Sequence, residues 1–169
     1  MSSTCLDSHY ICPVFVSGFT FIRNATKLDY PIKEAILSIL PLIDEMVVAV
    51  GSSEDDTRER VAAMSPKIKI IDTVWDDTLR EGGKVLAVET NKAFAQVSKQ
   101  ADWCIYIQGD ECIHEKYHEE IRSKMQQYNN DQQVDGFLFK YLHFYGSYDY
   151  IGDSRTWYRN EIRIVRNDQ

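Results

Sequence analysis

The sequence predicts an α/β fold, a three-layer sandwich in which a mostly parallel central sheet lies between helices. Three observations predict it. Short runs of β-branched and aromatic residues alternate with segments whose apolar residues recur at helical spacing, which favours crossovers between parallel strands. The run from Trp103 to Ile107 is apolar throughout, as in a strand that is buried on both faces. Several such runs end abruptly in polar residues, where ligands bind in open α/β sheets.

The expected elements alternate along the first two thirds of the chain. Residues 1 to 12 read as a lead-in. Pro31 suits the first turn of a helix, because its φ is already close to the helical value. Ser53 suits a helix cap, and the acidic residues that follow it favour a helix N-terminus. The expected strands are 14–22, 46–50, 68–74 and a fourth from Trp103, and the expected helices are 31–41, 53–64 and 84–98.

The last third of the chain has a different pattern. Apolar residues recur every fourth position between Ile113 and Tyr128, which indicates one more amphipathic helix. An aromatic run, 137–145, and a short apolar run, 162–165, follow as strands. No repeat or low-complexity linker interrupts the chain, so we expect residues 1–169 to form a single domain.

The composition limits the classes of partner. A chain of 169 residues with 44% hydrophobic residues can bury a proper core. The formal net charge of -7 and the pI of about 5.1 oppose non-specific binding to nucleic acid or to anionic lipid. We therefore expect no nucleic-acid partner, and an anionic ligand would need a local cation.

The sequence also suggests a location for the protein. The N-terminus lacks the features of a secretory signal, and the most apolar helical segment, 35–43, is too short to span a bilayer. We expect a soluble, cytoplasmic protein without a transmembrane segment. The cysteines lack paired Cys-x-x-Cys spacing, so reduced thiols are expected at Cys5, Cys12, Cys104 and Cys112.

Two stretches carry a resemblance to a known family. The order VFVSGFTFIRNATKLDYPIKEAILSILPLIDEMVVAVGSSEDDT, followed by WCIYIQGDE, resembles family 2 and related glycosyltransferases with the GT-A nucleotide-sugar fold. The likeness covers Val14 to about Glu111, and more loosely Gly136 to Arg166. It implies a GT-A-like sandwich and transfer of a sugar, with inversion, from a nucleoside diphosphate donor of the UDP or GDP type to an unknown acceptor.

The resemblance also implies a nucleotide site. It places nucleotide contacts at the end of the first strand and in the Ser/Thr motif after the second. Hydroxyls and carboxylates there can bind ribose and base, and an arginine supplies charge for phosphate. The implied nucleotide-binding residues are Thr20, Arg23, Asn24, Gly51, Ser53, Asp56 and Thr57. Plain helix capping is the alternative role for the second motif.

A metal site follows from the same resemblance. The family's Asp-x-Asp motif falls at Gln108-Gly109-Asp110, so its first carboxylate is missing here. Asp110 matches the second position, and Glu111 is a candidate second ligand. Adjacent carboxylates suit a hard divalent cation, so Mn²⁺ or Mg²⁺ is the expected cofactor, held by Asp110 and Glu111 in a weakened site.

An inverting transferase also needs a carboxylate base for the acceptor hydroxyl. Asp149, Asp153 and Glu161 are candidates, and Asp110 with Glu161 make up the expected catalytic pair. The aromatic stretches 141–148 and 157–161 suit a sugar acceptor or, alternatively, a core. Enzymes of this family usually continue well past this length, so the chain is expected to lack a C-terminal acceptor part. The alternative function is a catalytically incomplete nucleotide-sugar-binding module or fragment.

A competing motif points to another class of enzyme. The stretch from His114 to His118 reads His-Glu-x-x-His, which on a helix places two zinc ligands on one face with Glu115 as general base. It would indicate a zinc protease. The motif lies in a polar segment directly after the acidic turn, and no downstream Gly-x-x-His extends it, so this function ranks below the transferase.

Overall fold

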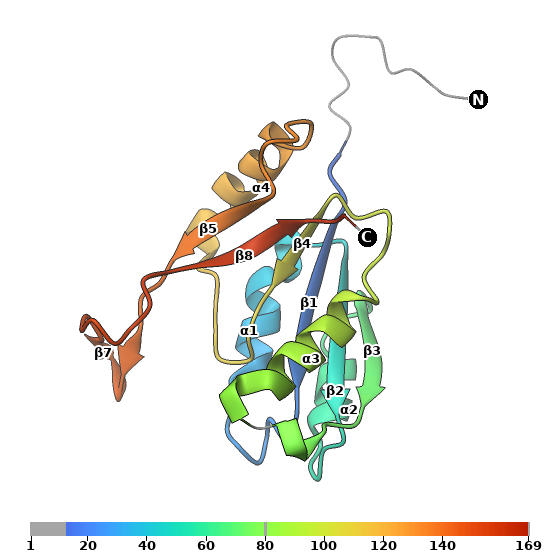
Figure 1. Ribbon diagram of the computed structural model, residues 1–169, viewed down its shortest axis with the longest axis vertical. Helices are drawn as coiled ribbons and strands as arrows, with labels where there is room; N and C mark the ends of the chain where they lie inside the picture. The colour runs from blue at the N-terminus through green and yellow to red at the C-terminus, as the bar shows by residue number, and fades with distance from the viewer. Residues whose placement is uncertain (1–12, 80, 169) are drawn as a thin grey trace.

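The computed structural model describes residues 13–79 and 81–168 and confirms the α/β sandwich (Figure 1). The six-stranded sheet has the order β3-β2-β1-β4-β8-β5. Neighbours among the first four strands in this order are parallel, and β8 runs antiparallel to β4 and to β5. The strands are β1 (Val16–Ile22), β2 (Glu45–Gly51), β3 (Ile68–Thr73), β4 (Trp103–Tyr106), β5 (Gly136–Lys140) and β8 (Asn160–Arg166).

Helices cover both faces of the sheet. Residues of α1, α2 and α4 join one apolar cluster, and α3 contributes to the cluster on the opposite face. The helices are α1 (Ile32–Ile39), α2 (Thr57–Ala62), α3 (Lys84–Phe94) and α4 (His118–Gln127), with 3-10 turns η1 (Leu40–Leu42), η2 (Asp77–Leu79), η3 (Glu81–Gly83) and η4 (Glu115–Tyr117). Within the described ranges, no helix is long and apolar enough to cross a membrane.

The central strand β1 divides its side chains between the two layers. Val16 and Ile22 pack in the cluster with α1, whereas Phe19 packs in the cluster with α3, as the alternation of a strand requires. Gly18 faces α1, where an added Cβ would lie 2.6 Å from the Met46 sulfur and 2.8 Å from Cδ1 of Ile43. The glycine therefore sets how closely α1 approaches the sheet.

Some expected boundaries are wrong. Ser53 does not cap α2, which begins four residues later at Thr57. The helix expected from Ile113 begins, after a 3-10 turn, only at His118. The expected lead-in, residues 1–12, lies outside the described residues.

The aromatic run at 137–145 is not one strand. It divides into β5 and the two-residue strand β6 (Phe144–Tyr145), which pairs with β7 (Ser147–Ile151). The β6–β7 hairpin extends away from the sheet, and every residue of both of its strands is exposed (Figure 1). It returns to the sheet through β8.

Candidate functional site

The loops after β1 and β2 are joined by hydrogen bonds at the carboxyl end of the sheet. The Asn24 backbone N–H donates to the Ser53 hydroxyl (3.0 Å), and the Asn24 side-chain oxygen accepts from the Glu54 N–H (2.8 Å). Asn24 adopts a φ of +54°, a left-handed conformation that asparagine tolerates better than most residues. The hydroxyl of Thr57 accepts from the Ala25 N–H (2.7 Å). The two loops are therefore one structural unit, which we call the loop pair (23–29 and 51–57).

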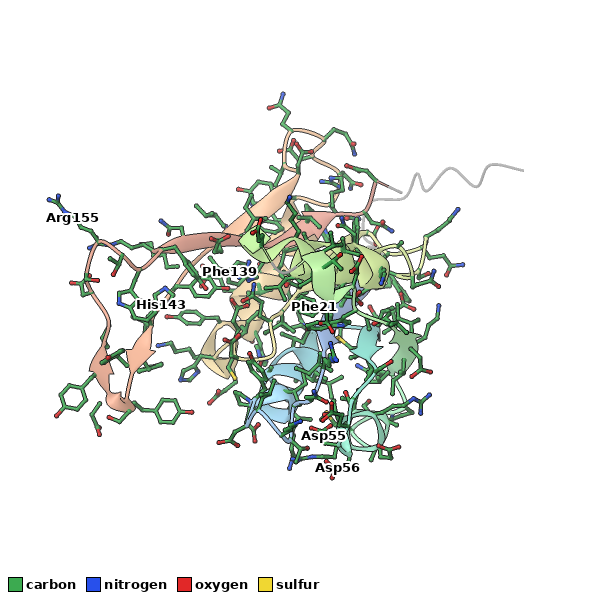
Figure 2. All side chains as sticks on the ribbon, turned by 60° about the horizontal axis from the view of Figure 1, so that its bottom comes forward. Phe21, Asp55, Asp56, Phe139, His143 and Arg155 are labelled. Carbon is green, nitrogen blue, oxygen red and sulfur yellow. The ribbon has the colours of Figure 1, made fainter. Side chains whose placement is uncertain are left out.

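Asp55 is the centre of the loop pair. Its carboxylate accepts from the Lys27 N–H (2.8 Å) and from the N–H (3.0 Å) and hydroxyl of Thr57. Desolvation acts to raise the pKa of Asp55, but these hydrogen bonds outweigh it and lower the pKa. Asp56 accepts from the Thr26 hydroxyl (2.6 Å) at the surface. Asp55 and Asp56 lie side by side in Figure 2.

The structure brings the predicted nucleotide-binding residues to one end of the sheet but gives several of them internal partners. Thr20 and Thr57 are fully buried, so neither is open to a ligand in this conformation. Asn24 and Ser53 bind each other across the loop pair. Thr20, Asn24 and Thr57 therefore build the site instead of lining it. Gly51 and Ser53 line the cavity at the ends of β2 and β3, and the Arg23 side chain is 25% exposed.

Arg23 lies over an aromatic ring that the sequence did not single out. Its guanidinium is 5.7 Å from the ring centre of Trp75, donates to the Ser52 carbonyl (3.2 Å) and lies 3.3 Å from the Asp77 carboxylate. A Cβ at Gly51 would be 2.4 Å from Nε1 of Trp75, so the indole requires a glycine there. The result is a cation and an aromatic ring beside the ends of β1 and β2.

Three buried polar atoms near these strand ends lack a hydrogen-bond partner among the described residues: Oγ1 of Thr73, Nε1 of Trp75 and Oε2 of Glu89. Thr73 pairs in register with Gly51. The other oxygen of Glu89, a fully buried side chain of α3, accepts from Lys92 (2.6 Å), which also donates to the carbonyl that follows β3 (3.3 Å). Leaving a buried polar group unpaired costs about 1–3 kcal/mol. These atoms have unused capacity for polar partners.

A cavity of about 340 Å³ opens at the ends of β2 and β3. Thr73 and Gly51 contribute to it from the strands, and Asp55 contributes from the loop pair. Its remaining lining residues are Val50, Ser52, Ser53, Arg58, Glu59 and Asp72. The cavity is polar and lies where open α/β sheets bind their ligands.

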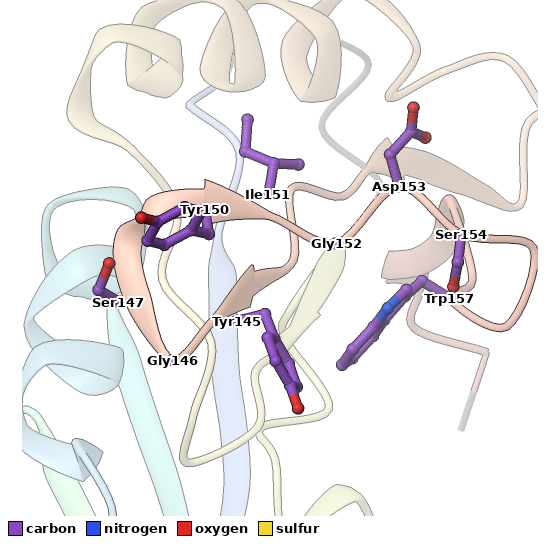
Figure 3. A pocket seen from close by; sticks show the side chains of 9 residues that line it. All are labelled: Tyr145, Gly146, Ser147, Tyr150, Ile151, Gly152, Asp153, Ser154 and Trp157. Atoms are coloured by element: carbon purple, nitrogen blue, oxygen red, sulfur yellow. The ribbon is translucent and has the colours of Figure 1, made fainter.

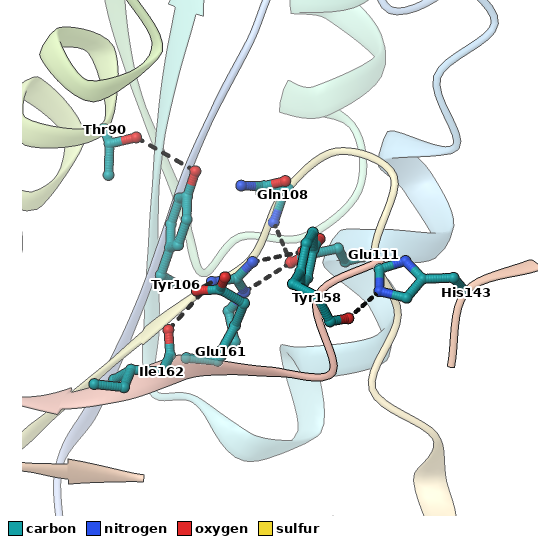
Figure 4. A network of polar contacts seen from close by, with 9 residues as sticks. Thr90, Tyr106, Gln108, Glu111, His143, Tyr158, Glu161 and Ile162 are labelled. Carbon is teal, nitrogen blue, oxygen red and sulfur yellow. Dashed lines mark hydrogen bonds and ion pairs between the residues drawn. The ribbon is translucent and has the colours of Figure 1, made fainter. Parts of the chain in front are cut away.

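A second polar centre lies at the end of β4 (Figure 4). Arg163 of β8 donates to Glu111 through Nε (2.9 Å) and Nη2 (2.6 Å), and the two side chains are only 9% and 11% exposed. The Gln108 N–H also donates to Glu111 (3.1 Å). The guanidinium lies 5.3 Å from the ring centres of both Tyr106 and Tyr141. We call these residues the Glu111–Arg163 centre.

Burial and charge in this centre set the protonation states of Arg163, Tyr141 and Tyr158. Burial acts to lower the pKa of Arg163, but the hydrogen bonds and charge of Glu111 outweigh it and raise the pKa. Burial, followed by the charge of Glu111, raises the pKa of Tyr141 and of Tyr158. The guanidinium therefore stays charged, and both phenols stay neutral hydrogen-bond donors.

This geometry revises the predicted metal site. Both oxygens of Glu111 are bound to Arg163, so Glu111 is not available beside Asp110 as a metal ligand. Across residues 13–79 and 81–168, no group of three His, Cys, Asp or Glu side chains is placed to hold a metal ion. The donor set does not fit a metal held by the protein alone. Asp110 itself is exposed, and Glu161 lies 3.8 Å from Arg163 and is 43% exposed.

The zinc-protease alternative is not supported. His114 has an extended backbone ahead of the 3-10 turn, so it does not share a helix face with His118. A ring nitrogen of His114 accepts from the Lys116 N–H (3.2 Å), and Nε2 of His118 is 2.8 Å from the Ser38 carbonyl oxygen. His118 thus joins α4 to α1.

Sequence reasoning missed Arg163, Trp75 and Glu89. Two of them carried a usable signal. Arg163 interrupts the short apolar run 162–165, and a charge that is buried there requires a partner. Glu89 falls on the buried stripe of α3, between Val85 and Ala93. Trp75 follows β3 in a polar loop and carried no comparable signal.

No protein-family model and no curated protein sequence matches the chain. Among solved structures, it is similar to TarS of S. aureus. The TarS 1–349 structure has a TM-score of 0.50 at 17% identity, over 68% of this chain and 33% of that one. The same fragment in complex with UDP-GlcNAc has a TM-score of 0.51 at 17% identity, over 68% and 32%. The fragment in complex with UDP has a TM-score of 0.50 at 16% identity, over 68% of this chain and 33% of that one. The chain thus spans about a third of the TarS fragment, and its fold is GT-A-like.

Proposed function

We propose that this chain binds a nucleoside diphosphate sugar at the ends of β1, β2 and β3 and transfers the sugar to an acceptor. One observation carries the proposal: Arg23 lies over Trp75, beside the unpaired hydroxyl of Thr73 and the polar cavity of about 340 Å³. The fold supports it, as does the binding of UDP-GlcNAc by TarS.

Each of these groups suits a part of a nucleotide. The Trp75 indole supplies an aromatic ring for a base, beside the Arg23 guanidinium. The hydroxyl of Thr73 can pair with a polar group of the ligand. Arg23 supplies positive charge, and its ion pair with the exposed Asp77 costs little to exchange for phosphate, because exposed pairs contribute little to stability.

Transfer with inversion requires a base for the acceptor hydroxyl. That oxygen would form a bond to the anomeric carbon while the bond from this carbon to the diphosphate breaks, and the hydroxyl proton would pass to a carboxylate. The exposed Asp110 and the partly exposed Glu161 lie beside the Glu111–Arg163 centre and are the candidates for this role. The phenols of Tyr141 and Tyr158 are neutral donors on the same side. Positive charge near the diphosphate would stabilise the leaving group.

Calorimetric titration with UDP, GDP and their sugars, with and without Mn²⁺, tests donor binding. We expect one nucleotide class to bind. Trp75→Ala should lower its affinity by about tenfold or more, since base stacking on an aromatic ring contributes about 1–3 kcal/mol. Tyr148→Ala, at an exposed ring of the hairpin, is the matched control and should bind as wild type does. Absence of binding for every nucleotide would overturn the proposal.

A second candidate is a nucleotide-sugar-binding module without transferase activity. The pairing of Glu111 with Arg163 favours it, because both oxygens of this carboxylate are occupied and cannot bind a metal beside Asp110. Both candidates predict nucleotide binding. Only an enzyme releases free nucleoside diphosphate when an acceptor is added, so a coupled assay for UDP or GDP release separates them.

A further inference from the structure

The β6–β7 hairpin and the loop after it border a shallow cavity of about 630 Å³ that is open to solvent (Figure 3). Three aromatic side chains line it, together with two hydroxyls and a carboxylate. The lining residues are Tyr145, Gly146, Ser147, Tyr150, Ile151, Gly152, Asp153, Ser154 and Trp157. The Glu111–Arg163 centre and the cavity between β2 and β3 contain none of these residues.

Glycines shape this cavity. A Cβ at Gly152 would lie 2.8 Å from Nε1 of Trp157, so the indole packs directly on the strand backbone. The Gly152 N–H donates to the His143 carbonyl (2.7 Å), which fixes the end of the hairpin. Gly146 has a φ of +74° and forms the reversal between β6 and β7. Backbone contacts therefore hold the Trp157 wall in place.

A row of aromatic rings joins the cavity to the Glu111–Arg163 centre. The ring of His143 lies 4.9 Å from Trp157, 4.5 Å from Tyr158 and 5.7 Å from Tyr141. Tyr141 in turn lies against the Arg163 guanidinium. Nε2 of His143 is 2.6 Å from the Tyr158 carbonyl oxygen, which ties the hairpin to the segment before β8 (Figure 4).

The lining has the chemistry of a carbohydrate site. Aromatic faces pack against the C–H surface of a sugar ring, while hydroxyls and carboxylates bind its hydroxyl groups. Tyr145 and Tyr150 are 70% and 68% exposed, so these rings are not a core. Asp153 is paired with Arg159 (3.1 Å), so the cavity does not present a strong net charge that would select an ion.

We propose that this cavity binds a saccharide unit, and that the acceptor is consequently a carbohydrate chain that runs along the aromatic row to the Glu111–Arg163 centre. The role as acceptor rests on the proposed function. Saccharide binding itself does not depend on it, and it needs neither a nucleotide nor a metal.

The test uses the full chain without nucleotide. Calorimetry or NMR titration would measure binding of three probes: tetrasaccharides of β-linked glucose, β-linked N-acetylglucosamine and α-linked mannose. We expect one of them to bind wild type in the millimolar range or tighter. Trp157→Ala should weaken it at least tenfold. Tyr150→Ala, at an exposed ring whose loss leaves the packing of Gly152 intact, should weaken it severalfold.

Tyr148→Ala is the control, because this ring is 84% exposed on the same strand but does not line the cavity. It should bind saccharide as wild type does. Failure of all three probes on wild type, or equal affinity in wild type and both cavity variants, would overturn the proposal. Measuring UDP and GDP affinities on the same samples distinguishes the two proposals. Saccharide binding without nucleotide binding would contradict only the proposed transferase function. Nucleotide binding without saccharide binding would contradict only the proposed carbohydrate cavity.

Discussion

The loop pair and the β6–β7 hairpin are built on opposite principles. In the loop pair, the Thr57 hydroxyl donates to Asp55 and accepts from the Ala25 N–H, 32 residues away. The Asn24 side-chain oxygen accepts from the Glu54 N–H, 30 residues away. In the hairpin, the large rings point into solvent, and an isolated two-stranded sheet is marginally stable by itself. The first region uses its polar groups to fix a backbone, whereas the second keeps its aromatic groups open for contact.

The largest effect is expected outside both regions, at the buried Glu111–Arg163 centre. Arg163→Ala would leave Glu111 buried without its cation, so it should lower the free energy of unfolding by about 3–5 kcal/mol. The double variant Glu111→Leu with Arg163→Met removes both charges and should recover most of this loss. Urea denaturation of the three proteins measures it. A loss below about 1 kcal/mol in the single variant would contradict the burial of this pair.

A smaller loss is expected from Asp55→Ala, which removes an acceptor of three hydrogen bonds in the loop pair. We expect about 2–3 kcal/mol by urea denaturation, the sum of a few modest hydrogen bonds. Asp153→Ala in the hairpin is the matched control. Its ion pair with Arg159 is exposed on both sides, so stability should not change measurably. Equal losses in both variants would remove the contrast between the regions.

The Asp55 carboxylate makes a pH-dependent contribution to the free energy of unfolding. The pKa of Asp55 is lower in the folded protein than its ordinary 3.8, so the folded state favours the ionised form. This contribution is fully present above pH 3.8 and is lost as the pH falls through the folded pKa. Stability measured from about pH 6 to about pH 2.5 should therefore fall more steeply in wild type than in Asp55→Asn. Parallel curves would show that Asp55 is not hydrogen-bonded as described.

The smallest effect on stability is expected from Gly152→Ala. The added Cβ would press on the Trp157 indole and change the wall of the hairpin cavity. The global unfolding free energy should change by less than about 1 kcal/mol, because the hairpin lies outside the main sheet. Saccharide affinity should fall severalfold in the same variant. Unchanged affinity with unchanged stability would mean that this wall does not contact the ligand.

The sequence predicted the parallel half of the fold because its signals are local. Strands β1 to β3 are short runs rich in β-branched and other apolar residues, and their observed bounds lie within two residues of the expected ones. The prediction that Ser53 caps α2 was wrong, because it rested on residue type alone. In the structure the Ser53 hydroxyl accepts from the Asn24 N–H, which is 29 residues away. The structural role of Asp55 was not predictable for the same reason, since the partners of a carboxylate depend on the neighbouring loop.

The candidate site was less predictable than the fold. Asp110 and Glu111 are adjacent and identical in charge, so sequence alone treats them as a pair. The structure separates them, because Arg163 lies 52 residues farther along the chain and binds only Glu111. Trp75 lies at the site only because Gly51 makes room for its indole. Such long-range pairings depend on the order of strands in the sheet, which residue patterns specify weakly.

The position of β8 has a consequence for the synthesis of the protein. This strand is the last of the sheet to be made, yet it lies between β4 and β5. Proteins emerge from the ribosome N-terminus first, at about 5–20 residues per second. The β1–β4 half can therefore assemble early, with the outer edge of β4 unpaired and Glu111 without its arginine. During that interval the nascent chain exposes an open strand edge, which is the feature most prone to mispairing, until Arg163 and its neighbours close it.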